Sequence, residues 1–270
     1  MQRTFALLLA VLTAAFAPPA ARADAATDQR LQDSRRVLES FTKMNEQSIP
    51  TWLLERAYGI VVFPEVIKSA LIVGGRGGRG VMAVRNPNGT WSNPVFVNLG
   101  GANIGFQFGL QQTELVLVLT SRKSVEGIAG GKFTLGADAS VAGGPVGRTA
   151  AAATDATFSA QVLSYARSQG LFAGVSLDAS VISVDDSSNV DAYGVPGILA
   201  SQILDGTAGT PSEAAREFTA ALAQATGAAD AAKPAAPPPA PDVPIAPGPK
   251  DGEAKTYPME DPAPGAPPPE

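Results

Sequence analysis

Cysteine and histidine are both missing from this chain of 270 residues. Without cysteine, the fold has neither disulfides nor thiolate metal sites, so packing alone must hold its core. Without histidine, the chain lacks the commonest general base and a favoured ligand of zinc and iron. These absences argue against hydrolases and transition-metal enzymes. We therefore expect a binding protein that is not an enzyme and uses neither cofactor nor metal.

The N-terminal segment has the pattern of a secretory signal peptide. Residues 1–23 begin with basic and polar side chains, continue through an apolar run at 5–16 and end in Ala21-Arg22-Ala23, a form that signal peptidase cleaves. The run is shorter than the roughly 20 residues that span a bilayer. We expect cleavage after Ala23 and export to the periplasm, the outer membrane or the medium. A retained membrane anchor is the alternative.

The C-terminal segment is rich in proline and acidic side chains. Residues 234–270 contain 14 prolines, six acidic residues and two lysines, a composition that cannot bury enough apolar surface to fold. We predict a disordered acidic tail over 227–270, which either acts as a solvated spacer or binds a protein partner. The folded domain is then expected over 24–226.

The hydrophobic pattern of the expected domain changes along the chain from helical spacing to short β-rich runs and back again. This order predicts an α+β fold, in which helices from the N- and C-terminal parts accompany a curved, barrel-like, mostly antiparallel sheet. The expected helices are 27–48, 51–58, 123–129, 197–204 and 212–225, and the expected strands include 60–63, 70–73, 81–85, 91–99, 104–110, 114–120 and 161–166.

Two motif matches lack the chemistry that they would need. The spacing Gly75-x-Gly77-x-x-Gly80 matches a dinucleotide-binding loop, but neither the helix nor the acidic residue that such a site requires follows it. Residues 185–191 alternate acidic and polar side chains as calcium ligands do. However, a valine and a proline replace the required glycine and glutamate. We interpret this segment as a solvated turn.

The best candidate site for an anion is the same glycine-rich stretch. Between residues 66 and 113 there is no acidic side chain, and the charged residues are Lys68, Arg76, Arg79 and Arg85. We expect Arg76 and Arg79 in an exposed loop, where guanidinium groups and backbone amides together bind phosphate oxygens. A flexible loop with solubilising arginines is the alternative.

The first expected helix is a second candidate for membrane contact. Its cations Arg35, Arg36 and Lys43 would lie near lipid phosphates if its apolar side entered the bilayer interface. The alternative is that this apolar side packs on the sheet. Nucleic acid is not an expected partner, because residues 24–233 carry a net charge of −3 and no basic stripe with interleaved aromatics.

Many motifs in register resemble the SYLF domain over about residues 30–225. They include Ile49-Pro50, Gly59-Ile60-Val61-Val62-Phe63-Pro64, Gly89-x-Trp91-Ser92-x-Pro94, Gly131-Lys132-Phe133, Gly143-Gly144-Pro145-Val146-Gly147-Arg148 and Gly170-Leu171-Phe172-Ala173-Gly174. This family comprises lipid-binding modules of bacterial exported proteins and of eukaryotic membrane-trafficking and actin-patch proteins. The resemblance implies phospholipid binding, to phosphoinositides in eukaryotic members, and no known catalysis. Actin binding is not expected of an exported protein.

The residues and the resemblance together predict peripheral, non-enzymatic binding of anionic phospholipid, with the head group left open. The expected lipid-binding residues are Lys68, Arg76, Arg79 and Arg85, helped by Arg35, Arg36 and Lys43. The competing hypothesis is a structural or partner-binding protein of the cell envelope that uses its proline-rich tail.

Overall fold

The structure is a computed structural model that describes residues 20–43, 48–70, 73–104, 109–145, 159–168, 171–172, 177 and 179–227. The expected signal peptide lies almost wholly outside these residues, and so does the expected tail beyond Gly227. All described residues belong to one compact unit, Met1–Pro234.

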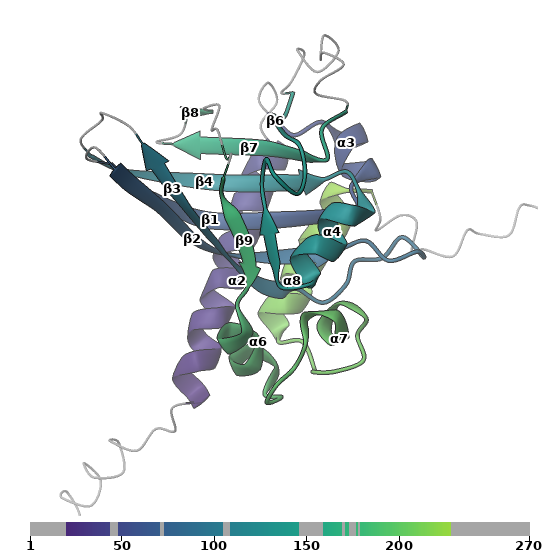
Figure 1. Cartoon of the computed structure of the whole chain (residues 1–270). Coiled ribbons are helices and arrows are strands. Elements are labelled where there is room, and N and C mark those ends of the chain that lie inside the picture. The colour runs from purple at the N-terminus through teal and green to yellow at the C-terminus, as the bar shows by residue number, and fades with distance from the viewer. Residues whose placement is uncertain are drawn as a thin grey trace, which may run out of the picture. The chain divides into compact units, whose positions relative to one another are not determined.

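Along the chain, helices occur at both ends of the described domain, and all the named strands lie between these helices (Figure 1). The helices are α2 (Ala20–Lys43), α3 (Thr51–Arg56), α4 (Arg122–Ala129), α6 (Asp186–Tyr193), α7 (Ala200–Leu204) and α8 (Glu213–Ala225). The strands are β1 (Gly59–Ala70), β2 (Val73–Val84), β3 (Val95–Ile104), β4 (Gly109–Leu119), β5 (Lys132–Thr134), β6 (Val141–Gly143), β7 (Val162–Ser168), β8 (Leu171–Phe172) and β9 (Val181–Val184).

The strands form one curled sheet in the order β5-β9-β3-β2-β1-β4-β7-β6, and β8 pairs with β7. Every described strand pair is antiparallel except β6 with β7. The predicted α+β class with a curved, mostly antiparallel sheet is therefore confirmed. The predicted helices at 123–129 and 212–225 also correspond closely to α4 and α8.

Helix α2 packs against the sheet with the apolar face that its sequence predicts. Leu31, Leu38 and Phe41 are fully buried, and the helix contacts β1, β2 and α8. Burying each such side chain contributes about 1.5–3 kcal/mol relative to leaving it in water. Of the two alternatives for this helix, the structure therefore shows the packed one. The helix also begins earlier than predicted, at Ala20.

The central strand β1 contains a proline, which is unusual because proline cannot donate a ladder hydrogen bond. The register of β1 shifts around Pro64 against both of its neighbours, between Val62 and Glu65 on the β2 side and between Phe63 and Val66 on the β4 side. Such β-bulges accommodate a proline and bend the strand. The bulge separates the wholly buried run from Ile60 to Phe63 from a continuation in which alternate side chains are exposed.

Two segments differ from the sequence-based expectation. The glycine-rich stretch predicted as a loop is part of strand β2, which pairs without interruption with β3 from Val73 to Met82. Residues 185–191, predicted as a solvated turn, instead begin helix α6: Asp185 caps it and is buried. In both segments tertiary contacts override local composition, because glycine and Asp/Ser/Asn favour turns only when no ladder or cap engages them.

Gly80 faces the bulge where the backbones of β1 and β2 leave no room for a side chain. A Cβ atom added there would lie 2.4 Å from the carbonyl oxygen of Val62 and 2.6 Å from Cδ1 of Phe63. We expect Gly80→Ala to lower the free energy of unfolding by about 1–3 kcal/mol through overpacking, measured by urea denaturation. Gly100→Ala is the control, because nothing lies within 4 Å of its added Cβ. Equal stability of the two variants would contradict the close approach.

Candidate functional site

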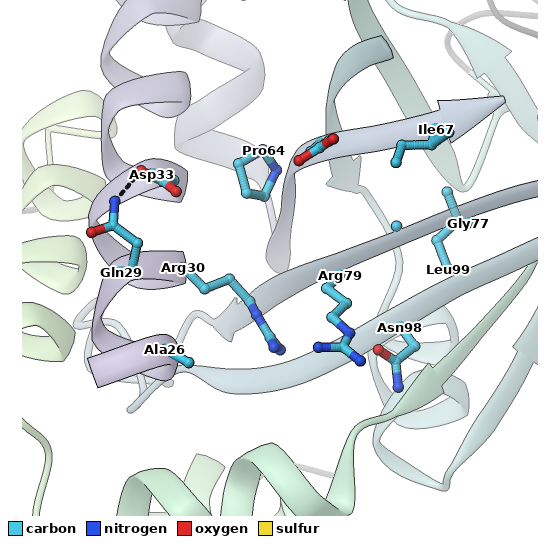
Figure 2. A pocket seen from close by; sticks show the side chains of 12 residues that line it. Ala26, Gln29, Arg30, Asp33, Pro64, Ile67, Gly77, Arg79, Asn98 and Leu99 are labelled. Carbon is cyan, nitrogen blue, oxygen red and sulfur yellow. Dashed lines mark hydrogen bonds between the residues drawn. The ribbon is translucent and has the colours of Figure 1, made fainter. Parts of the chain in front are cut away.

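An open groove of about 740 Å³ lies between the first half of α2 and strands β1 to β3. Figure 2 shows the side chain of Arg30 extending from the helix toward Arg79 on the sheet, with Asn98 beside Arg79. The lining residues are Ala26, Gln29, Arg30, Asp33, Pro64, Glu65, Ile67, Gly77, Gly78, Arg79, Asn98 and Leu99. The groove thus combines two guanidinium groups with two carboxylates and two side-chain amides.

The strand register brings three polar side chains of the groove into one row. Arg79 lies directly opposite Glu65 of β1 on one side and Asn98 of β3 on the other. Residues directly opposite in an antiparallel pair point to the same face, with Cβ atoms about 4.5–5.5 Å apart. Because the bulge at Pro64 lies immediately before Glu65, it sets which β1 side chains join this row.

Arg79 is the cation of the groove that is open to solvent. Its side chain is exposed, and among the described residues it makes no ion pair, hydrogen bond or ring contact. Glu65 is also exposed and likewise has no ion-pair partner in the described part of the chain. The two opposite charges are neighbours in the ladder and yet are both available to a ligand.

Arg30 is held in place at the back of the groove. Its Nη1 donates to Oδ2 of Asp185 at 3.1 Å, and the side chains are 10% and 8% exposed respectively. Its guanidinium group also lies 5.3 Å from the centre of the Phe96 ring, a cation–π distance. Burial lowers the pKa of Arg30 from its usual value; Asp185 opposes this effect, and the nearby charge of Arg79 adds to it.

Asp185 connects the groove to the start of helix α6. Its carboxylate accepts hydrogen bonds from the Ser188 backbone amide at 3.2 Å and from the hydroxyl groups of Ser187 and Ser188, each at 2.8 Å. Burial acts to raise the pKa of Asp185. These hydrogen bonds, together with that of Arg30, outweigh it and hold the pKa below its usual value of 3.8. Asp185 therefore stays ionised and fixes Arg30.

The predicted pairing of Arg76 with Arg79 in one loop is wrong. Both residues lie in β2, three positions apart, and successive strand residues point to opposite faces. Arg76 instead lies opposite Lys68 of β1 on the other face of the sheet, where it is half-buried near Gly101. The sheet thus divides the predicted cluster into Arg79 on the groove face and Lys68 with Arg76 on the other.

Arg85 has a structural role that the other predicted site residues do not share. Its Nε and Nη2 atoms donate to the backbone oxygens of Ala57 at 3.2 Å and Leu54 at 3.0 Å. The guanidinium group also stacks 4.9 Å from the centre of the Trp91 ring. These contacts engage two of the five N–H donors of Arg85 and hold its guanidinium group at the end of α3. Arg85 is not among the residues that line the groove.

The predicted cations of α2 are paired with carboxylates on the protein surface. Lys43 bonds to Glu39 at 2.9 Å, Arg35 lies within 3.5 Å of Glu39 and 3.8 Å of Glu217, and Arg36 pairs with Asp33. Exposed pairs of this kind are worth about 0–1 kcal/mol each. A membrane surface could therefore compete for them, but α2 itself remains packed.

The groove also contains four residues that the sequence did not indicate: Arg30, Asp33, Glu65 and Asn98. Arg30 and Asp185 are 155 residues apart in the chain, and no local pattern indicates that they meet. For Glu65 a weak signal existed, since it is the last acidic residue before the positively charged stretch. Its position opposite Arg79 follows only from the strand register.

Within the described residues, no group of three or more Asp and Glu side chains is arranged to hold a metal ion. No helix in the same part of the chain is both long and apolar enough to cross a bilayer.

Sequence comparison places the chain among known proteins. Residues 100–225 match the family described as "Ysc84: Las17-binding protein actin regulator". Over 185 residues the chain is 36% identical to "SH3 domain-containing YSC84-like protein 1" of Xenopus laevis, covering 66% of this chain and 55% of that protein. The chain belongs to the SYLF domain family. The predicted family is thereby confirmed.

The SYLF chain spans only part of the relatives that it matches. Over 187 residues it is 37% identical to "Protein YSC84" of Saccharomyces cerevisiae, which covers 66% of this chain and 40% of the yeast protein. "LAS seventeen-binding protein 3" of the same species is 37% identical over 179 residues. These names describe binding and regulation and do not name a chemical reaction, which agrees with the prediction of a non-enzymatic protein.

Asp185→Asn tests the anchor of Arg30. We expect the variant to lower the free energy of unfolding by about 2–4 kcal/mol at neutral pH, because it leaves a buried cation without its counter-charge. The pKa of Asp185 is lower in the folded protein than in the unfolded chain. The stability that its carboxylate adds to the fold is therefore fully present above pH 3.8 and is lost as the pH falls below that value.

The difference in free energy of unfolding between wild type and Asp185→Asn, measured by urea denaturation, should therefore shrink as the pH falls from about 5 toward 2. The control is Asp186→Asn at the adjacent exposed position, which should cost about 0.3–1 kcal/mol through the helix dipole. A difference that is independent of pH would contradict the ion-pair interpretation.

Proposed function

We propose that this SYLF protein is exported and binds anionic phospholipid peripherally at the cell envelope, through head-group phosphate. The observation that supports this most directly is Arg79, an exposed guanidinium group without an ion-pair partner among the described residues, at the mouth of an open groove. A guanidinium group donates paired hydrogen bonds that match two phosphate oxygens.

The groove supplies further groups that suit a phosphate. Arg30 adds a second positive charge, and the clamp of Asp185 and Phe96 fixes it before any ligand arrives. Asn98, opposite Arg79 in the ladder, adds an amide that can donate a hydrogen bond. A preorganised cation loses little conformational entropy on binding, so it contributes more affinity than a mobile one.

Residues beside the groove favour a membrane surface over a free solute. Ile67 lines the groove and is 47% exposed, one of three large apolar side chains that are exposed in the described part of the chain. Such a side chain can be buried in the apolar part of a membrane surface while the groove holds a head group, and a free solute does not offer this burial.

The expected affinity is weak and depends on salt. Each cation near an anionic membrane surface contributes about 1 kcal/mol, and this attraction falls off within about 8–10 Å at physiological salt. With α2 packed in the core, membrane contact uses the groove and its rim and does not require a helix to insert. This distinguishes the proposal from an amphipathic-helix anchor.

A second candidate function is the binding of a protein partner. One ground is the description of the matched family, which names Las17 binding. The other is the proline-rich segment of this chain. Extended proline-rich segments bind aromatic grooves of partner domains. On this alternative, lipid binding would be incidental and the tail would carry the function.

Arg79→Gln tests the lipid proposal. We expect about fivefold weaker sedimentation with vesicles that contain phosphatidylglycerol, because one charge near the surface is lost. Arg56→Gln is the matched control, since it removes an exposed arginine at the end of α3, away from the groove lining. Equal binding by Arg79→Gln and wild type, with both proteins folded by circular dichroism, would remove the groove from the site.

Deletion of residues 234–270 separates the two candidate functions. We expect the shortened protein to keep its vesicle affinity within about twofold, because the groove is built from residues 26–99 of the described domain. The tail also carries more acidic than basic side chains, so its loss should not weaken attraction to an anionic surface. A large loss of vesicle binding would instead assign the function to the tail.

A further inference from the structure

The side chains that line the groove carry balanced charges, which an entirely anionic ligand would not need. Arg30 and Arg79 are accompanied by the carboxylates of Asp33 and Glu65. Asp33 already accepts a hydrogen bond from Gln29 at 2.9 Å and pairs with Arg36, so it is partly neutralised. Glu65 has no such partner among the described residues. Any phosphate bound by Arg79 would therefore lie near an uncompensated carboxylate.

We infer that the groove recognises a phosphodiester that carries a primary ammonium group, as in ethanolamine and serine head groups. Resting on the proposed phospholipid binding, this inference specifies the head group. The phosphate binds Arg79 and Arg30, and the ammonium group donates to Glu65. In these head groups only a short carbon link separates phosphate from nitrogen. Both groups can therefore reach Arg79 and Glu65, which are directly opposite in the ladder, where Cβ atoms lie about 4.5–5.5 Å apart.

The same geometry disfavours two other head-group chemistries. A polyphosphorylated head group would place additional negative charge beside Glu65 and Asp33. Repulsion between like charges at short range would make its binding free energy less favourable. A choline head group carries no N–H donor for a carboxylate, and sites for quaternary ammonium are built from aromatic faces. None of the described residues that line the groove is aromatic.

The ordinary alternative is that Glu65 and Arg79 merely neutralise each other in solution. The two interpretations differ in what removal of Glu65 does. If Glu65 only screens Arg79, then Glu65→Gln should strengthen binding to every anionic head group by the same factor. If Glu65 holds an ammonium group, the variant should lose the preference for amine-bearing head groups while it keeps phosphate binding.

The test compares the full chain on vesicles of phosphatidylcholine with equal fractions of either phosphatidylserine or phosphatidylglycerol. These two lipids carry the same net charge, but phosphatidylserine has an ammonium group, balanced by a carboxylate of its own, and phosphatidylglycerol has neither. We expect wild type to bind the serine vesicles about fivefold more tightly, as one charge contact is gained. Glu65→Gln should bring this ratio close to one, and Arg79→Gln should weaken binding to both lipids. Glu126→Gln, at an exposed position of α4, should leave the ratio unchanged.

The outcomes separate the inference from the proposed function. Equal wild-type binding to both lipids, or a uniform gain on Glu65→Gln, would overturn ammonium recognition and leave phosphate binding intact. Binding to neither vesicle would overturn the proposed function itself.

Soluble head groups distinguish the source of the ligand. Glycerophosphoethanolamine should displace the protein from serine vesicles at lower concentration than glycerophosphoglycerol does, and Glu65→Gln should abolish this difference. Equal displacement by the two compounds would contradict the inference. If glycerophosphoethanolamine binds while wild type binds no vesicle, the groove recognises a free solute, and the membrane proposal fails while the head-group chemistry stands.

Discussion

The proline in the central strand is the constraint on which the site depends. Pro64 cannot donate a ladder hydrogen bond, and β1 bulges against both neighbours at this point. The bulge requires a residue without a side chain on the facing strand, and Gly80 fills that position. It also ends the wholly buried part of the strand, so that Glu65 and Ile67 reach solvent. The groove lies where this change occurs.

Charge placement in the groove follows from the same strand geometry together with one long-range contact. The ladder places Arg79 between Glu65 and Asn98, while the buried ion pair with Asp185 positions Arg30 from the helix side. A buried pair of this kind contributes little net stability, because desolvation offsets much of the attraction. Its effect is positional: it fixes a cation at the edge of a solvent-filled space.

The sequence alone predicts the fold class, the family and several elements, because these depend on local signals. Helix α8, for instance, follows from the cap at Ser212 and the apolar spacing after it. The groove could not be predicted. Glycines 75, 77 and 78 suggest a loop, and only their pairing with β1 and β3 shows a strand. The opposite faces of Arg76 and Arg79, and the contact of Arg30 with Asp185, likewise need the register and the tertiary packing.

The contacts of α2 with the end of the domain affect the order in which the chain can fold. The hydroxyl group of Ser212, which caps α8, donates to Asp28 at 2.6 Å across 184 residues, and α2 packs along α8. The first helix therefore cannot complete its packing until nearly all of the domain has been synthesised. Long-range closure of this kind slows folding. Slow folding would keep the chain unfolded for longer, a state that suits the export proposed for this protein.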